Sequence, residues 1–174
     1  MIKYYILLPL LFSAFASCAQ ESATRPHCTD DEFDQKVAKV ISFSVPVIGV
    51  EDLKDMYNQP LLLDAREKSE YDVSHIEGAQ YIGYKKLDLS VLDTVTKDQT
   101  IVVYCSIGYR SEKIGEKLIN MGYTNVFNLY GSIFEWVNRG NEVVDENDEA
   151  TKEVHTYNKK WSKWVNEDKA VKVW

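Results

Sequence analysis

The stretch TIVVYCSIGYRSEKIGEKLINMG, residues 100–122, decides the fold. Its first part holds a continuous apolar run, Ile101-Val102-Val103, which is typical of a strand buried on both faces of a parallel sheet. A helix is predicted over Ser111–Met121, because its apolar residues fall at helical spacing and Gly122 ends it. The stretch therefore predicts a strand, a loop that carries Cys105, and a helix.

Strands and helices alternate on both sides of this unit. Strands are predicted at Val45–Ile48, Leu61–Asp64, Ala79–Ile82, Thr100–Tyr104 and Asn125–Leu129. Helices or helical turns are predicted at Val50–Asn58, Glu67–Val73, Leu87–Val95, Ser111–Met121 and Ile133–Asn138. This alternation indicates an α/β fold with parallel strands and helices on both faces. Ligands of such sheets bind beyond the carboxyl ends of the strands, where Asp64 and Cys105 stand.

Composition limits the classes of function. The chain has 174 residues, of which 45% are hydrophobic and 27% charged, which indicates one globular domain with short extensions. Its net charge of −7 argues against a nucleic-acid partner, because phosphate contacts need clustered Lys and Arg. Three cysteines are too few for a disulfide framework and match no zinc spacing. We expect neither a metal nor an organic cofactor.

The N-terminus reads as an export signal. Residues 1–17, MIKYYILLPLLFSAFAS, combine one Lys, a short apolar stretch and small residues before Cys18, which predicts a lipoprotein signal peptide with Cys18 as the lipidated residue. An ordinary cleaved signal with an incidental cysteine is the alternative. We expect a protein of the bacterial cell envelope, held on the periplasmic side or at the outer membrane by this lipid. Residues 18–43 are predicted to form a tether and a short helix.

The C-terminal part, residues 145–174, is predicted to be an acidic loop followed by an amphipathic helix. The apolar residues that suggest this helix follow helical spacing: Val154, Tyr157, Trp161, Trp164 and Val165. Such a helix could lie on a bilayer. We favour packing against the domain or a partner.

The loop after residues 100–104 combines a nucleophile with an anion-binding cradle. Cys105 is followed by Gly108, which allows a tight turn, and by Arg110, which adds a positive charge where a helix begins. Backbone N–H groups at a helix start bind negative charge and lower the pKa of a thiol. The alternative is a structural buried thiol, which would not explain Gly108 and Arg110.

Four motifs in register resemble single-domain rhodaneses, which are sulfurtransferases. Cys105-x-x-Gly108-x-Arg110-Ser111 resembles their active loop, and Leu63-Asp64-Ala65-Arg66 resembles their strand-end Asp-x-Arg. The other matching segments are Glu70-Tyr71 with His75–Ala79, where Glu77 replaces a common proline, and Gly122-Tyr123 with Leu129–Trp136. We therefore predict a rhodanese-like domain over residues 44–144.

The resemblance implies a five-stranded parallel sheet and a reaction through a Cys105 persulfide. Cys105 and Arg110 would be catalytic. The loop residues Ser106, Ile107, Gly108, Tyr109 and Ser111 would bind the transferred sulfur, and Asp64 and Arg66 would support the site. The partners would be a small sulfur donor and acceptor, or a persulfide-carrying protein. Because Ser106 and Ile107 are uncharged, a polysulfide or protein persulfide is a plausible donor beside thiosulfate.

Two other functions stay open. A cysteine phosphatase or arsenate reductase has five residues between its cysteine and arginine, whereas four intervene here. The shorter loop suits one sulfur atom better than a tetrahedral oxyanion. A non-catalytic rhodanese-like module that docks a partner protein is the other alternative, and the intact Cys105 and Arg110 favour the enzyme.

Four contacts are also predicted. Arg66 and Glu70 stand four apart on a predicted helix and are expected to pair. His75 is expected to anchor a turn rather than to carry protons, and Gly115 to mark close packing of its helix on the sheet. Cys28 is a candidate for a disulfide with Cys105 in an oxidising compartment.

Overall fold

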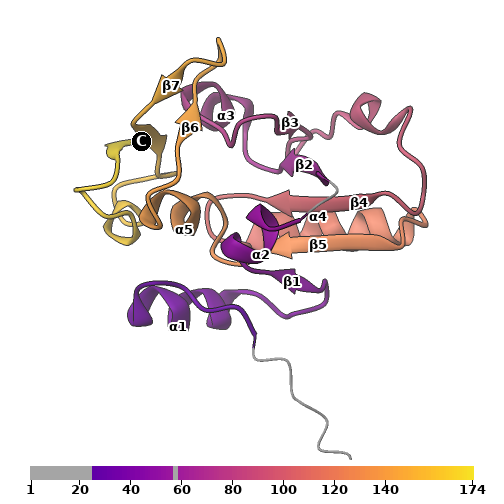
Figure 1. Ribbon diagram of the computed structural model, residues 1–174, viewed down its shortest axis with the longest axis horizontal. Coiled ribbons are helices and arrows are strands. Elements are labelled where there is room, and N and C mark those ends of the chain that lie inside the picture. Colours follow the sequence, from indigo (N-terminus) through magenta and orange to yellow (C-terminus); the bar gives the residue numbers. More distant parts are fainter. Residues whose placement is uncertain (1–24, 57–58) are drawn as a thin grey trace, which may run out of the picture.

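The computed structural model describes residues 25–56 and 59–174 of the chain. Five strands form one sheet in the order β1-β5-β4-β2-β3, and every neighbouring pair is parallel (Figure 1). Their bounds are β1 Val47–Ile48, β2 Leu61–Asp64, β3 Gln80–Tyr81, β4 Thr100–Tyr104 and β5 Asn125–Leu129. The predicted α/β fold with a five-stranded parallel sheet is confirmed.

Helices cover both faces of the sheet. Their bounds are α1 Asp31–Val40, α2 Val50–Lys54, α3 Lys68–Val73, α4 Tyr109–Asn120 and α5 Ser132–Asn138, with a 3-10 turn, η1, at Leu89–Leu92. Strand β4 alternates between the two faces, as its pleat requires. Val102 and Tyr104 join one core cluster with residues of α1, α2 and α5, whereas Ile101 and Val103 join a second cluster with residues of α4.

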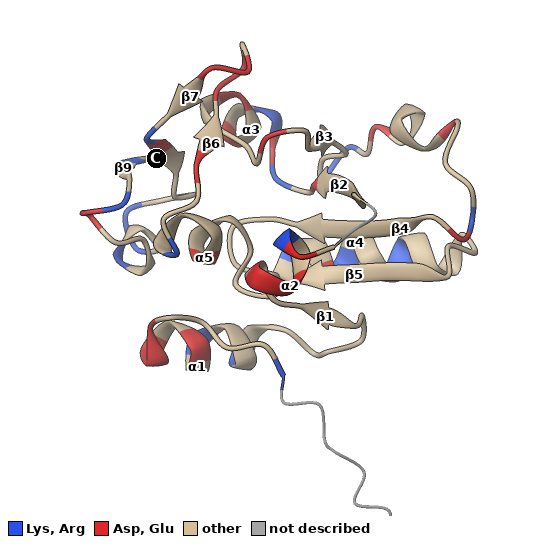
Figure 2. Cartoon of the chain, viewed as in Figure 1, with Lys and Arg blue, Asp and Glu red and all other residues tan. Residues whose placement is uncertain are grey.

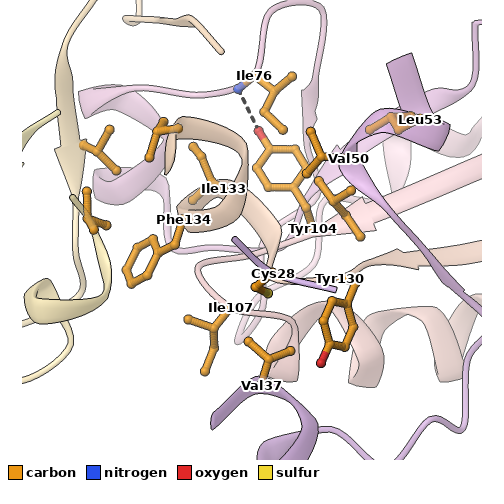
Figure 3. Packing of buried hydrophobic residues seen from close by; sticks show 14 of the residues in the cluster. Cys28, Val37, Val50, Leu53, Ile76, Tyr104, Ile107, Tyr130, Ile133 and Phe134 are labelled. Carbon is orange, nitrogen blue, oxygen red and sulfur yellow. Dashed lines mark hydrogen bonds between the residues drawn. The ribbon is translucent and has the colours of Figure 1, made fainter. Parts of the chain in front are cut away.

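The first cluster includes a buried hydroxyl with a partner. The side chain of Tyr104 is fully buried, and its hydroxyl accepts a hydrogen bond of 3.1 Å from the backbone N–H of Ile76 (Figure 3). The aromatic and aliphatic side chains of α5, Ile133 and Phe134, lie in the same cluster. The contact satisfies a polar group that would otherwise be costly to bury.

Gly115 lies where α4 meets a close neighbour. A Cβ built at this position would stand 3.0 Å from both γ-carbons of Val45, which precedes β1. Close packing therefore explains the glycine inside a helix, as predicted, although the side chain that comes near belongs to the segment that leads into the sheet.

The C-terminal segment is not the predicted amphipathic helix. It forms β6 Val143–Val144, β7 Ala150–Thr151, β8 Glu153–His155, a 3-10 turn η2 at Ser162–Trp164, and β9 Val171–Val173. Strand β8 pairs with β9 in parallel, and β6 pairs with β7 in an antiparallel hairpin. Long-range pairing of β-branched residues overrides the helical spacing of the apolar ones.

The segment nevertheless packs back on the domain. Val154 and Val165 are buried in the first core cluster, and Trp161 and Trp164 pack against it. In Figure 1 this yellow part of the chain lies beside α5, at the end of the molecule toward which β4 and β5 point. The apolar residues of the tail thus contact the domain rather than forming a free helix.

The N-terminal helix α1 is held by a cap and an ion pair. Asp30 accepts from the backbone N–H of Phe33 at 2.7 Å, and Arg25 pairs with Asp34 and also donates to the hydroxyl of Tyr130. None of the helices in the described ranges is long and apolar enough to cross a membrane. The predicted signal at residues 1–17 and the lipidated Cys18 lie outside the described residues.

Candidate active site

Cys105 follows β4 directly and is the first residue of the tight loop that leads to α4. The residue is 1% exposed, and its Sγ accepts a hydrogen bond from the backbone N–H of Gly108 at 3.2 Å. Gly108 precedes α4 with φ of 118°, a conformation that residues with a side chain rarely adopt. This turn brings the N-terminus of a twelve-residue helix toward the thiol.

Buried polar side chains fix the loop to the rest of the sheet. The amide of Asn128, on β5, donates to the carbonyl of Gly108 at 2.9 Å and accepts from the hydroxyl of Ser111 at 2.7 Å. The backbone N–H of Cys105 donates to the hydroxyl of Ser132 at 3.1 Å, and the N–H of Ile133 donates to the carbonyl of Cys105. The loop is therefore rigidly placed before any substrate binds.

Arg110 has a carboxylate partner. Its two terminal nitrogens donate to the two oxygens of Glu70, on α3, at 2.5 and 2.8 Å, and Nη2 also donates to the hydroxyl of Ser106 at 2.9 Å. The side chains of Arg110 and Glu70 are 13% and 3% exposed. This bidentate pair holds the guanidinium beside the loop and compensates much of its charge. The predicted Arg66–Glu70 pair is wrong, because Glu70 turns toward Arg110.

The surroundings lower the pKa of the Cys105 thiol. Burial alone would raise this pKa, but the positive charge of Arg110 and hydrogen bonds from Ser111 and the backbone of Gly108 outweigh it. The net result is a pKa below that of a free cysteine. This direction increases the fraction of the thiolate, the nucleophilic form, relative to a free cysteine at the same pH.

The rate of alkylation should report this thiolate. We expect Cys105 to react with iodoacetamide with a pH midpoint below that of free cysteine, because the rate rises as the thiol loses its proton. Arg110→Ala should move the midpoint to higher pH. Lys113→Ala, which removes a more exposed cation from the same helix, should leave it in place. Peptide mass mapping over a pH series separates Cys105 from Cys28, and equal shifts in both variants would contradict the assignment.

Asp64 and Arg66 form a second, fully buried ion pair behind the loop. Nε of Arg66 lies 3.0 Å from each oxygen of Asp64, and Nη2 lies 2.6 Å from Oδ2. Nη2 also donates to the carbonyl of Ser74 at 2.5 Å. The guanidinium lies 5.9 Å from the ring centroid of Tyr104. The pair joins the end of β2 to the segment after α3. Its role in supporting the site stays a prediction.

His75 anchors a turn, as predicted. Its backbone exchanges hydrogen bonds of 2.8 and 2.9 Å with Val144, and its ring stacks on Tyr71 with centroids 3.9 Å apart. Nδ1 lies 3.2 Å from the carbonyl of Tyr71. These contacts fix the segment between α3 and β3 against the β6–β7 hairpin.

The predicted disulfide between Cys28 and Cys105 is wrong. Both are free, buried thiols within the described residues, and they belong to different core clusters. Cys28 lies beside Gly131, where a Cβ would meet its Sγ at 2.8 Å. Burial and the nearby Glu135 and Asp34 raise the pKa of Cys28 well above its usual value, which keeps it protonated.

A cleft of about 450 Å³ opens over Cys105, within the usual size of a small-molecule site. Besides Cys105, Ser106 and Arg110, much of its lining is apolar or aromatic, from Val40, Tyr84, Ile107, Tyr109, Tyr157 and Trp161. Glu67 and Lys85 complete it and lie 3.4 Å apart. The cleft thus joins the loop to α1 and to the C-terminal segment.

The structure gathers most of the predicted site residues. Ser106, Ile107, Tyr109 and Arg110 line the cleft with Cys105, the backbone N–H of Gly108 donates to the thiol, and the hydroxyl of Ser111 donates to Asn128. Glu70, Asn128 and Ser132, which hold the loop, were not predicted as site residues. A polar Asn128 between Phe127 and Leu129 in a buried strand was the available signal. The role of each loop residue stays a prediction.

The chain thus combines a parallel α/β sheet with a buried cysteine of lowered pKa in the loop that precedes α4. The rhodanese-like domain model matches residues 49–139, more than half of the chain. The chain therefore belongs to the rhodanese-like family.

Relatives and solved structures agree with this membership. The chain is 30% identical over 102 residues to the tRNA uridine(34) hydroxylase of Photorhabdus laumondii, covering 55% of this chain and 29% of that protein. It is 31% identical over 86 residues to the probable adenylyltransferase/sulfurtransferase MoeZ of Mycobacterium tuberculosis, covering 49% and 22%. The chain thus spans less than a third of the length of these curated relatives.

The fold is similar to that of a rhodanese-like domain from an Anabaena species. The TM-score is 0.53 at 23% identity, over 57% of this chain and 79% of that one. A thiosulfate sulfurtransferase of Pseudomonas aeruginosa gives a TM-score of 0.53 at 24% identity, over 60% and 21%. At these identities the likeness concerns the fold.

Proposed function

We propose that this protein is a sulfurtransferase that carries a sulfane sulfur on Cys105. The observation that carries the proposal is the environment of the Cys105 thiol. The thiol is buried in the loop before α4 and accepts a hydrogen bond from the N–H of Gly108, and the charge of Arg110 lowers its pKa. Among the relatives, one is named a probable adenylyltransferase/sulfurtransferase. No metal or organic cofactor is needed for this chemistry.

The transfer has two displacement steps. The Cys105 thiolate attacks the outer sulfur of a donor, a bond forms between Sγ and that sulfur, and the donor's own bond breaks, so that its electron pair leaves with the donor fragment. From thiosulfate the fragment is sulfite, and from a persulfide it is a thiolate. An acceptor such as cyanide then attacks the terminal sulfur and leaves as thiocyanate, while the electron pair of the sulfur–sulfur bond returns to Sγ. Loop N–H groups stabilise the anionic persulfide.

Two other activities have less support. A phosphatase needs an arginine free to clamp the phosphoryl oxygens, whereas both terminal nitrogens of Arg110 bind Glu70 here. An RNA substrate, as in the name of the hydroxylase relatives, would meet a chain of net charge −7. Figure 2 shows acidic residues, in red, along α1, α2 and the β6–β7 hairpin.

Mass spectrometry of the intact protein tests the function. We expect a mass increase of one sulfur atom, mapped to Cys105, after exposure to thiosulfate, an organic persulfide or an inorganic polysulfide, and its loss when cyanide is added. A chain that acquires no sulfur from any of these donors would instead be a partner-docking module of the same fold.

We also propose that the protein is exported and lipid-anchored through Cys18, on the strength of the sequence at residues 1–17. We expect Cys18→Ala, expressed in a host that processes lipoproteins, to move from the detergent fraction to the aqueous fraction. Cys28→Ala should remain in the detergent fraction with the wild type. Equal solubility and processing of wild type and Cys18→Ala would contradict the anchor.

A further inference from the structure

The cleft over Cys105 has a wall that the family-matched residues do not supply. The match covers residues 49–139, whereas Val40 ends α1 and Tyr157 and Trp161 follow β8. These three side chains line the same cleft as Ile107 of the active loop. Two extensions of the chain therefore add apolar and aromatic surface next to the reacting thiol.

Tyr157 is held in place rather than buried. Its φ is 67°, in the left-handed region that bulky residues rarely adopt. The backbone N–H of Tyr157 donates to Nδ1 of His155 at 3.0 Å, and the N–H of Asn158 donates to the carbonyl of Thr156 at 2.8 Å. Tyr157 is nevertheless 54% exposed as a residue. Core packing does not explain a strained, exposed aromatic residue at the mouth of a cleft.

The ring of Tyr157 stands over the catalytic arginine. The guanidinium carbon of Arg110 lies 5.4 Å from the ring centroid, within the range of a cation–π contact. The segment that carries the ring is anchored on both sides, by the β8–β9 pairing and by the buried Val165. The wall is thus a fixed part of the site.

The cations of the cleft already have carboxylate partners. Arg110 binds Glu70 in bidentate fashion, and Lys85 lies 3.4 Å from Glu67. A small inorganic dianion would therefore gain little from charge here. Selection among sulfur donors is left to contacts with the apolar and aromatic lining.

We propose that this wall selects sulfur donors with an apolar organic body, whose leaving fragment packs against Tyr157 and Trp161. The inference rests on the proposed function, since it concerns the donor of the same reaction. For an organic thiosulfonate, the Cys105 thiolate takes the outer sulfur. The bond between that sulfur and the sulfonyl sulfur breaks, and the electron pair leaves on the sulfinate. Charge and electrons balance without a further reactant.

Two donors with one reacting group test the selection. Benzenethiosulfonate and methanethiosulfonate carry the same charge and differ only in the phenyl or methyl group. The difference between their rates of sulfur transfer to cyanide therefore reports the contact of that group with the apolar wall. We expect the kcat/KM of the wild type to be about tenfold or more higher for benzenethiosulfonate. Tyr157→Gly keeps the positive φ and removes the ring, and should reduce this preference by about fivefold.

Phe43→Gly is the matched control. Phe43 is also an exposed aromatic residue, 43% exposed with φ of 57°, but it stacks on Tyr130 and does not line the cleft. It should keep the wild-type preference. The inference is overturned if the wild type treats both donors alike, or if Tyr157→Gly lowers both by the same factor.

Binding separates this inference from the proposed function. In Cys105→Ser, benzenesulfinate should bind more tightly than methanesulfinate in an NMR titration, and the added Tyr157→Gly change should remove the difference. If neither thiosulfonate loads sulfur on wild-type Cys105 but this binding difference appears, the sulfur transfer fails and the selective wall stands. If the sulfinates bind equally, the wall is refuted whatever the enzyme does.

Discussion

Cys105→Ser should abolish sulfur transfer and leave the fold intact. A serine hydroxyl is nearly isosteric with the thiol and can still accept from Gly108, but it does not ionise at neutral pH and forms no persulfide. We expect the rate of transfer from thiosulfate or polysulfide to cyanide to fall by about a thousandfold or more. Circular dichroism and denaturant unfolding should match the wild type, because the buried contacts of the loop remain.

The other described thiol supplies the control for this prediction. Cys28→Ser replaces a buried cysteine that lies in the opposite core cluster, so it should keep transfer per folded molecule even if it lowers stability. An aryl phosphate should be assayed beside the sulfur donors. Transfer that survives in Cys105→Ser, or phosphate hydrolysis by the wild type without any persulfide, would overturn the assignment.

Local patterns predicted the central sheet because each strand is encoded by its own residues. The continuous apolar run at Ile101–Val103 indicates a strand that is buried on both faces. This indication comes from the run itself and requires no knowledge of the neighbouring strands. The tail is different. Val154 and Trp161 fit a helical period, yet Val154 lies in β8, whose partner β9 begins at Val171. The spacing of apolar residues within one segment cannot reveal that this segment pairs with a strand farther along the chain.

The site divides in the same way. Cys105, Gly108 and Arg110 fall within six consecutive residues, so their spacing alone indicated a thiol in an anion-binding loop. Glu70 precedes Arg110 by forty residues, so helical spacing favoured the nearer Arg66 as its partner. In the structure Arg66 instead pairs with Asp64 at the end of β2. Tyr157 could not be placed at the cleft while its segment was expected to be helical.

Arg66→Met should be among the most destabilising single changes in the chain. The side chains of Arg66 and Asp64 are both fully buried and form an ion pair inside the core. Removing the guanidinium leaves the Asp64 carboxylate without its counter-charge and the carbonyl of Ser74 without its donor. Breaking one partner of such a pair costs about 3–5 kcal/mol. Denaturant unfolding should show this loss.

The double variant Asp64→Asn with Arg66→Met decides whether that loss comes from a stranded charge. An asparagine oxygen can still accept from the backbone N–H of residue 66, as Oδ1 of Asp64 does at 2.9 Å. Nη1 of Arg66 finds no hydrogen-bond partner among the described residues, so even the native pair is incompletely satisfied. Because no buried charge remains, the double variant should be more stable than Arg66→Met by about 1 kcal/mol or more. If it is no more stable, lost packing rather than the stranded carboxylate explains the effect.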